Sequence, residues 1–198
     1  MIRHLMLTTA VLALAACGAP DPEPAPAPEP APPVVAPPAA DVLTAQGFGP
    51  LRIGMTRAEV EAALGPDSNP GAVGGPDPAS CDIFHPARAP EGLTVMVENG
   101  VLTSIWLQNG STLKTDRGFG VGDTATAIKA AYGPLAYVSP HKYAEAPAEY
   151  ITTWSVGTAA GYVQNPAARG IAYHIGTEGR AEHVAAGGPS IQYVEGCL

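Results

Sequence analysis

The sequence has few basic residues, few aromatic residues and few cysteines. Of 198 residues, ten are Lys or Arg, three are Cys, and 6% are aromatic. From residue 41 onward, nine scattered Lys and Arg stand against fifteen Asp and Glu. Neutralising the phosphates of nucleic acid needs clustered Lys and Arg, so this balance argues against a nucleic-acid partner.

Short catalytic motifs are also missing. The sequence contains no G-x-S-x-G, no H-E-x-x-H, no C-x-x-C and no phosphate-binding loop. We therefore expect no cofactor and a role that is not enzymatic, although a catalytic group assembled from distant residues would leave no such motif.

The one long apolar run lies at the N-terminus and is too short to span a membrane. It covers Leu5–Ala16 after the basic Arg3, whereas a spanning helix needs about 20 apolar residues. The run ends in "LAAC", which resembles the bacterial lipobox, so we predict a signal peptide over residues 1–16 and lipid attachment at Cys17. By resemblance to the sorting rule of enteric bacteria, Gly18 in place of aspartate favours the outer membrane.

Residues 17–40 predict a spacer after the lipidated cysteine. Ten of the 22 prolines lie between Pro20 and Pro38. Proline fixes φ and cannot donate a backbone hydrogen bond, so such a stretch is extended and semi-rigid. We expect a tether, with a proline-rich recognition motif as the alternative.

The remaining cysteines, Cys81 and Cys197, form an even pair in an exported chain, which predicts a disulfide. The alternative is a nucleophilic Cys81 assisted by His85 in "CDIFHPAR", but an oxidising compartment consumes free reactive thiols.

Two similar stretches each predict a short helix. "RIGMTRAEVEAALG" (Arg52–Gly65) contains a T-x-x-E capping box that begins at Thr56, and "FGVGDTATAIKAAYG" (Phe119–Gly133) offers Thr124 or Asp123 as N-cap. Each ends in Gly-Pro, which stops a helix. Helices of about eight residues are unstable alone, so each is expected to pack on a sheet.

A hairpin is predicted after each helix. Asn99-Gly100 lies between two β-rich runs, which is the strongest short-range hairpin signal. A two-residue turn there pairs Val97 with Leu102, Val95 with Ser104, and Leu93 with Trp106. The second hairpin is expected to turn at Glu178-Gly179, with an apolar face of Ile171, Tyr173, Ile175 and Val184.

The predicted fold class is therefore α+β, with two tandem units that each pack a short helix on an antiparallel meander. The first unit is expected over residues 41–112 and the second over residues 113–198.

The segment "IGMTRAEVEAALG" resembles the G-M-T-x-x-x-V-x-x-x-x-G turn and helix of two groups of exported proteins. One is the BamE/SmpA-type lipoprotein of the outer-membrane β-barrel assembly machinery, and the other is the tandem-repeat β-lactamase-inhibitor protein. The assembly lipoprotein has one unit with two helices, and the inhibitor proteins are not tethered, so the chain departs from both. The resemblance implies a location in the cell envelope and a duplicated fold, and it implies no activity.

The second hairpin also places His174 opposite His183, and two imidazoles across an antiparallel pair can share a metal if a third ligand is present. The alternative is two partly solvated histidines on the outer face of the sheet.

We expect a lipid-anchored envelope protein that faces the periplasm and binds another envelope protein or inhibits one. The alternative is a lipoprotein that binds a small molecule or a metal at the seam between the two units.

Overall fold

A computed structural model describes residues 41–72, 74–155 and 161–197, and residues 1–40, with the predicted signal peptide, Cys17 and spacer, lie outside that range. The described residues form two α-helices, α1 (Arg57–Leu64) and α2 (Ala125–Tyr132), and two 3₁₀ helices, η1 (Gly133–Leu135) and η2 (Pro189–Gln192). No helix in the described part is long and apolar enough to cross a membrane. The strands are β1 (Val42–Thr44), β2 (Gly47–Phe48), β3 (Leu51–Arg52), β4 (Cys81–Phe84), β5 (Leu93–Glu98), β6 (Val101–Leu107), β7 (Lys114–Thr115), β8 (Tyr137–Pro140), β9 (Glu149–Trp154), β10 (Gly170–Ile175) and β11 (Ala181–Gly187).

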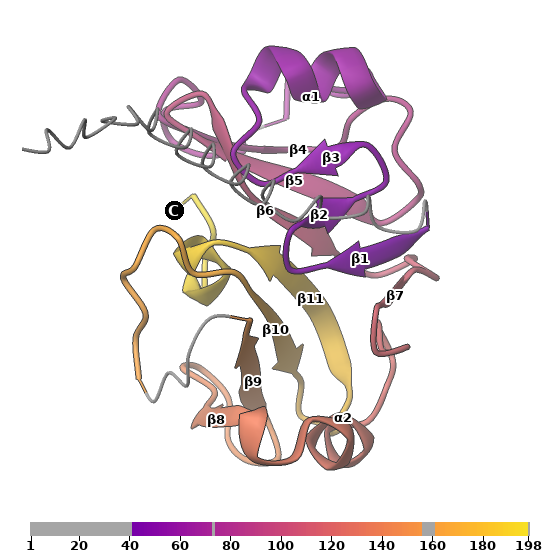
Figure 1. The fold of residues 1–198 in the computed structure, drawn as a ribbon, viewed down its shortest axis with the longest axis vertical. Helices are drawn as coiled ribbons and strands as arrows, with labels where there is room; N and C mark the ends of the chain where they lie inside the picture. The colour runs from indigo at the N-terminus through magenta and orange to yellow at the C-terminus, as the bar shows by residue number, and fades with distance from the viewer. Residues whose placement is uncertain (1–40, 73, 156–160, 198) are drawn as a thin grey trace, which may run out of the picture. The chain divides into compact units, whose positions relative to one another are not determined.

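Seven strands from both halves of the chain form one sheet, in the order β4-β5-β6-β11-β10-β9-β8 (Figure 1). The halves join where β11 pairs antiparallel with β6, with Val184 opposite Leu107 and Gly187 opposite Ser104. The prediction of two tandem helix-and-meander units was therefore wrong, since the described chain is mostly β-sheet with two short helices. Two separate meanders would each leave a long edge unpaired, and the β6–β11 pairing removes both edges.

A smaller sheet, in the order β3-β2-β1-β7, also crosses the predicted boundary at residue 112. β7 follows that boundary but pairs in parallel with β1, with Thr115 beside Leu43. The beginning of the described chain is thus held by residues of the second half.

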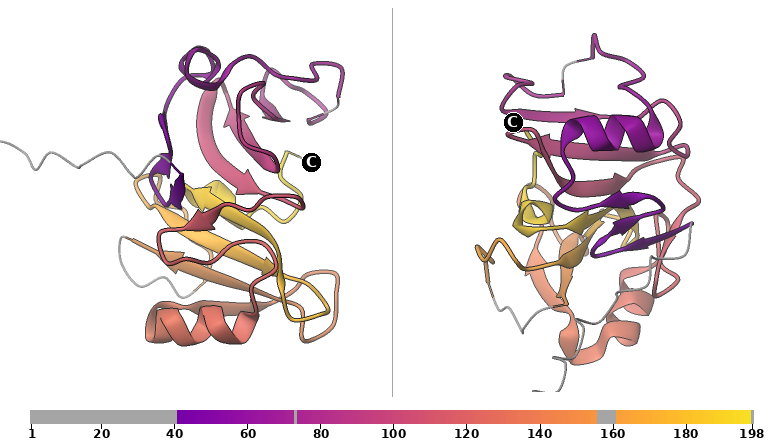
Figure 2. Two further views of the ribbon diagram at one scale, coloured as in Figure 1. Left: turned by 90° about the vertical axis from the view of Figure 1, so that its right-hand side faces the viewer. Right: turned by 45° about the horizontal axis from the view of Figure 1, so that its top comes forward.

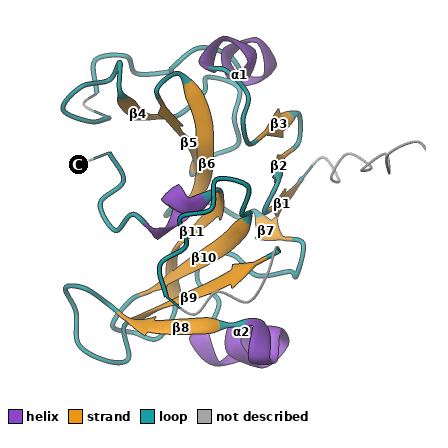
Figure 3. Cartoon of the chain, turned by 60° about the vertical axis from the view of Figure 1, so that its left-hand side comes forward, coloured by secondary structure: helices purple, strands orange, loops and turns teal. Residues whose placement is uncertain are grey.

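Both helices begin and end where the sequence predicts. Thr56 caps α1, and its side chain and that of Glu59 form the reciprocal capping box. Thr124 caps α2 by accepting a hydrogen bond from the Ala127 amide. Figures 2 and 3 show the two helices at opposite ends of the large sheet.

The first hairpin turns at Asn99-Gly100 as predicted, but only one of its three predicted pairs is confirmed. Val97 lies opposite Leu102, whereas Val95 lies opposite Ile105 and Leu93 opposite Leu107. A register shift beside Val97 inserts one extra residue in β6. A bulge of this kind moves every later side chain of the strand to the other face.

The large sheet has one well-covered face and one partly covered face. On the first, which we call the helix-side face, buried residues from both helices and the small sheet form the main hydrophobic cluster, including Leu43, Val60, Ile105, Ile128 and Tyr173. On the opposite face, which we call the C-terminal face, a smaller cluster contains Met96, Trp106, Ala172, Ala185, Ile191 and Cys197. The apolar face predicted for the second hairpin is confirmed on the helix-side face.

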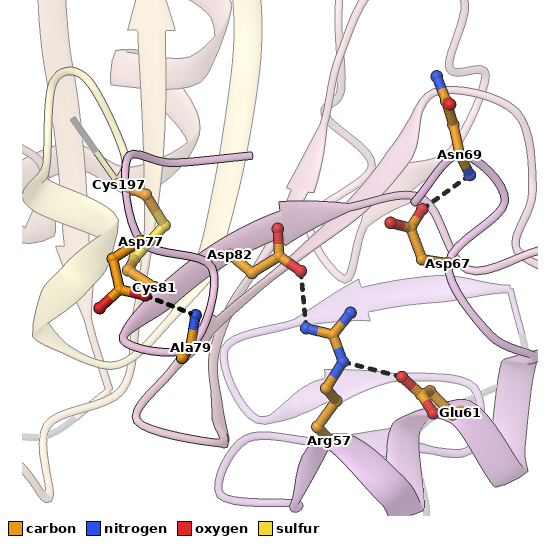
Figure 4. A network of polar contacts seen from close by, with 9 residues as sticks. All are labelled: Arg57, Glu61, Asp67, Asn69, Asp77, Ala79, Cys81, Asp82 and Cys197. Carbon is orange, nitrogen blue, oxygen red and sulfur yellow. Dashed lines mark hydrogen bonds and ion pairs between the residues drawn. A yellow bond between two sulfur atoms is a disulfide. The ribbon is translucent and has the colours of Figure 1, made fainter. Parts of the chain in front are cut away.

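A disulfide between Cys81 and Cys197 ties the C-terminal segment to β4, as the sequence predicts (Figure 4). In the same view Arg57 of α1 lies 2.6 Å from the Asp82 carboxylate and 2.8 Å from Glu61. Asp82 is only 6% exposed, so Arg57 neutralises a buried charge and holds α1 on β4.

Candidate functional site

The C-terminal face holds a cavity of about 250 Å³ over β8, β9 and β10. Alternate residues of a strand point to the same face, so Tyr150, Thr152 and Trp154 line it from β9, with Ala172 and His174 from β10. Thr152 lies directly opposite Ala172, which gives the cavity a low floor between larger aromatic walls. The remaining lining residues are Tyr137, Ser139, Pro140, Gly161, Tyr162, Ile191, Gln192 and Val194.

Gly170 makes room for one of those walls. It lies opposite Trp154 in the sheet, and a Cβ added to Gly170 would meet the Trp154 ring at 2.6 Å and the Thr153 carbonyl oxygen at 2.5 Å. Contacts this short do not occur for real side chains, so the indole keeps its position because residue 170 is glycine.

Two segments from beyond β9 close the cavity on its other side. The Gln192 side chain accepts a hydrogen bond from the Val163 amide at 2.8 Å and donates one to the Val163 carbonyl at 2.8 Å. This two-way bond fixes the segment that carries Tyr162 against η2. The Tyr162 ring is 61% exposed, so it is available at the rim of the cavity.

A row of aromatic rings forms the wall of the cavity where Tyr150 and His174 line it. His141 stacks on Tyr150 with centroids 4.8 Å apart, Tyr150 meets His174 edge-on at 5.0 Å, and Trp106 lies 5.4 Å from His174. The Nδ1 atom of His141 accepts hydrogen bonds from the backbone amides of Tyr143 and Ala144, each at 3.1 Å. These contacts hold the wall in place from both sides of β9.

His174 is uncharged at neutral pH. Burial, with smaller contributions from His183 and His141, lowers its pKa from 6.5 to about 4. The lining contains no Asp, Glu, Lys or Arg among the described residues. A ligand charge placed there would lose its hydration without gaining a partner, so the cavity suits an uncharged molecule.

His174 and His183 lie opposite each other in β10 and β11, as predicted. The turn itself differs from the prediction, because the register shifts between His174 and Ile175, Ile175 lies opposite Ala181, and the Gly179 amide donates to the Gly176 carbonyl. Their ring centroids are 6.3 Å apart and the rings meet edge-on. Within the described residues no group of three His, Cys, Asp or Glu side chains is placed to hold a metal ion, so this pair has no third protein ligand there. Burial lowers the pKa of His183 as well.

The alternative of a Cys81 nucleophile was wrong, because the Cys81 sulfur is bonded to Cys197. His85, its expected base, instead makes a 2.7 Å contact between its Nδ1 atom and the Leu93 carbonyl oxygen. Cys17, the predicted lipid attachment site, lies outside the described residues.

Sequence reasoning did not single out Tyr150, Thr152 and Trp154. The segment "EYITTW" does carry a signal, because these three residues alternate with Ile151 and Thr153 as expected of a strand with two different faces. What the pattern lacks is any indication that one face stays uncovered.

The sequence matches no family model and none of the curated proteins compared with it. Among solved structures, one similar chain is a DUF4309 family protein (YjgB) from Bacillus subtilis. It is 20% identical, the match covers 75% of this chain and 88% of that one, and the TM-score is 0.44. Because this likeness is low, it assigns neither a family nor a function to the chain.

Proposed function

We propose that this chain is a non-enzymatic binding protein of the cell envelope that holds a small, uncharged, ring-bearing molecule in its aromatic cavity. The observation that carries the proposal is the combination of aromatic walls, a small Ala172 floor and the absence of charged lining among the described residues. Ligand sites are typically concave and apolar with a few polar groups that set orientation.

The lining narrows the class of ligand. Tyr150 and Trp154 bring aromatic surface to the cavity, which suits contact with a planar ring or with the C–H groups of a saturated one. Ser139 and Thr152 add hydroxyl groups that both donate and accept hydrogen bonds. These features favour a neutral ring that carries hydroxyl or amide groups, as in a neutral sugar.

Tryptophan fluorescence tests this proposal, because Trp154 lines the cavity and the chain has only two tryptophans. The full chain in detergent is titrated with glucose and N-acetylglucosamine, and with the charged analogues glucuronate and glucosamine. We expect saturable changes with at least one neutral probe and none with its charged analogue. Equal responses to neutral and charged probes, or no response to any neutral probe, would contradict the proposal.

Two neighbouring threonines supply matched variants for that titration. Thr152→Val removes a hydroxyl from the cavity, whereas Thr153→Val makes the same change on the helix-side face. Both residues are buried, so the two substitutions are expected to change the stability of the fold by similar amounts. Weaker binding is expected for the Thr152 variant alone.

Envelope attachment through Cys17 is part of the same proposal and rests on the lipobox. In cells supplied with radioactive palmitate, the chain is expected to be labelled, and Cys17→Ser should abolish the label. Cys81→Ser serves as the control, because that cysteine is in the disulfide. Labelling that survives Cys17→Ser would refute the anchor.

Binding of another envelope protein is a second candidate function, favoured by exposed apolar residues near the edge strand β8. Leu135, Val138, Tyr143 and Tyr162 are 41–61% exposed and lie in or near the segments around this edge. Crosslinking in intact cells, followed by mass spectrometry, tests it. We expect Val138→Asp to remove a crosslinked partner and Val101→Asp, at a 38% exposed valine elsewhere, to keep it. A partner lost equally from both variants would argue against this surface.

A further inference from the structure

A second cavity, of about 260 Å³, lies where β5 and β6 of the first half meet the C-terminal segment. Ile53 and Leu102 line it from the first half, and Pro189 lines it from the segment that follows β11. We call it the seam cavity. Tyr162 and Gln192 line the aromatic cavity, while Gln164 and Tyr193 line the seam cavity, so the same two segments separate the two sites.

The seam cavity differs from the aromatic cavity in carrying both signs of charge. Arg169 lines it immediately before β10, and Glu98 lines it at the end of β5. Neither side chain takes part in any of the ion pairs found among the described residues. Both are partly buried, and partly buried charges interact more strongly with a ligand than fully solvated ones.

Arg169 is held in a fixed position with bonding capacity remaining. Its Nη1 atom donates to the carbonyl oxygens of Pro166 and Ala168, both at 2.8 Å. The guanidinium group has five N–H donors in a planar fork, which suits a carboxylate. These two bonds use both hydrogens of Nη1, so the three N–H groups on Nε and Nη2 remain for a ligand.

The Glu98 carboxylate acts on Tyr193, which also lines the seam cavity. Burial raises the pKa of the Tyr193 phenol, and the nearby Glu98 carboxylate raises it further. Glu98 lies in β5 and Arg169 lies immediately before β10, and these two strands are three inter-strand steps apart, or about 14 Å at about 4.8 Å per step. Both residues line the same cavity, so one small molecule bound there can contact both.

The seam cavity also contains an unsatisfied polar group. The Ser190 hydroxyl is buried and has no hydrogen-bond partner in the described part of the chain. Buried polar groups in folded proteins are almost always satisfied, and an exception calls for an explanation such as a missing ligand or water.

We infer that the seam cavity binds a free α-amino acid with an apolar side chain, its carboxylate on Arg169 and its ammonium on Glu98. Ile53 and Val101 then cover the apolar side chain of the ligand. This site is separate from the proposed function, because it needs both charges of the ligand and the aromatic cavity accepts neither.

Calorimetric titration of the full chain in detergent tests the inference with three probes. L-leucine carries both charges, N-acetyl-L-leucine only the carboxylate, and L-leucinamide only the ammonium. We expect leucine to bind, and each derivative to bind about tenfold more weakly because one charge-assisted contact is lost. Absence of leucine binding, or equal binding of all three probes, overturns the inference.

Charge-removing variants assign each end of the ligand. Arg169→Gln should weaken leucine binding about tenfold. It should leave leucinamide binding unchanged, because leucinamide has no carboxylate for Arg169 to bind. Glu98→Gln should weaken leucine binding by a similar factor. It should leave the binding of N-acetyl-leucine unchanged, because that probe has no ammonium group. Ala172→Leu fills the aromatic cavity and should leave leucine binding as it is. If Ala172→Leu abolishes leucine binding while Arg169→Gln has no effect, the ligand sits in the aromatic cavity and the seam site is refuted.

Discussion

The strongest quantitative prediction concerns the protonation of His174, the buried histidine in the wall of the aromatic cavity. Its pKa falls from 6.5 to about 4 on folding, mainly through burial. Between these two values the unfolded chain binds a proton at His174 and the folded chain does not. The free energy of unfolding therefore decreases as the pH falls from about 6.5 to about 4.

The size of the effect follows from the pKa difference. At about 1.4 kcal/mol per pH unit, the full change from His174 is about 3 kcal/mol, and it is complete below the folded pKa. Above about pH 7 the residue is neutral in both states and contributes no pH dependence.

Urea unfolding of the wild type and of His174→Phe at pH 7, 6, 5 and 4 measures the contribution of His174 to the pH dependence of stability. Phenylalanine keeps an aromatic ring in the wall and cannot be protonated. Carboxylates and the other histidines are present in both proteins, so the stability difference between them reports His174 together with its interaction with His183 and His141. We expect that difference to move by about 3 kcal/mol in favour of the variant between pH 7 and pH 4. A difference that does not change with pH would refute the assignment of a neutral, buried His174.

Two further predictions concern stability away from the cavities. Replacing both Cys81 and Cys197 by serine opens a loop with a sequence separation of 116 residues, and should cost about 5 kcal/mol in urea unfolding on the chain-entropy model; a cost below about 1 kcal/mol would contradict that model here. Arg57→Gln leaves the buried Asp82 carboxylate without its cation, and should cost about 2 kcal/mol because the 34% exposed Arg57 side chain is partly screened by solvent. The matched change Glu61→Gln breaks only the exposed pair on α1 and should cost less than about 0.5 kcal/mol, so equal costs for the two variants would be evidence against a special role for Asp82.

Several parts of the fold could be read from the sequence because they depend on residues close together in the chain. The capping box at Thr56 satisfies backbone amides within the same helical turn, so α1 begins where its sequence indicates. The turn at Asn99 works in the same way, since Asn99 adopts a φ of 50° that few residues other than asparagine and glycine tolerate. The disulfide was predictable by elimination, once Cys17 was assigned to the lipid.

The bulge in β6 could not be read from the sequence. A regular two-residue hairpin puts Trp106 on the same face as Leu93, whereas the structure places it on the C-terminal face beside Ala185. The bulge is favoured because it brings Ile105 and Leu107 into the main cluster together, and this gain exists only when the helices and the small sheet are packed on that face.

The sequence by itself determined the two helices, the turn of the first hairpin, the disulfide pair and the pairing of His174 with His183. Only the tertiary structure decided that the two halves share one sheet and that its C-terminal face is left open over β9 and β10. The reason is physical: caps and turns are satisfied by neighbours a few residues away, whereas the pairing of β6 with β11 joins segments about 80 residues apart. Such a pairing is selected by what the whole chain buries, and so are the cavities that remain.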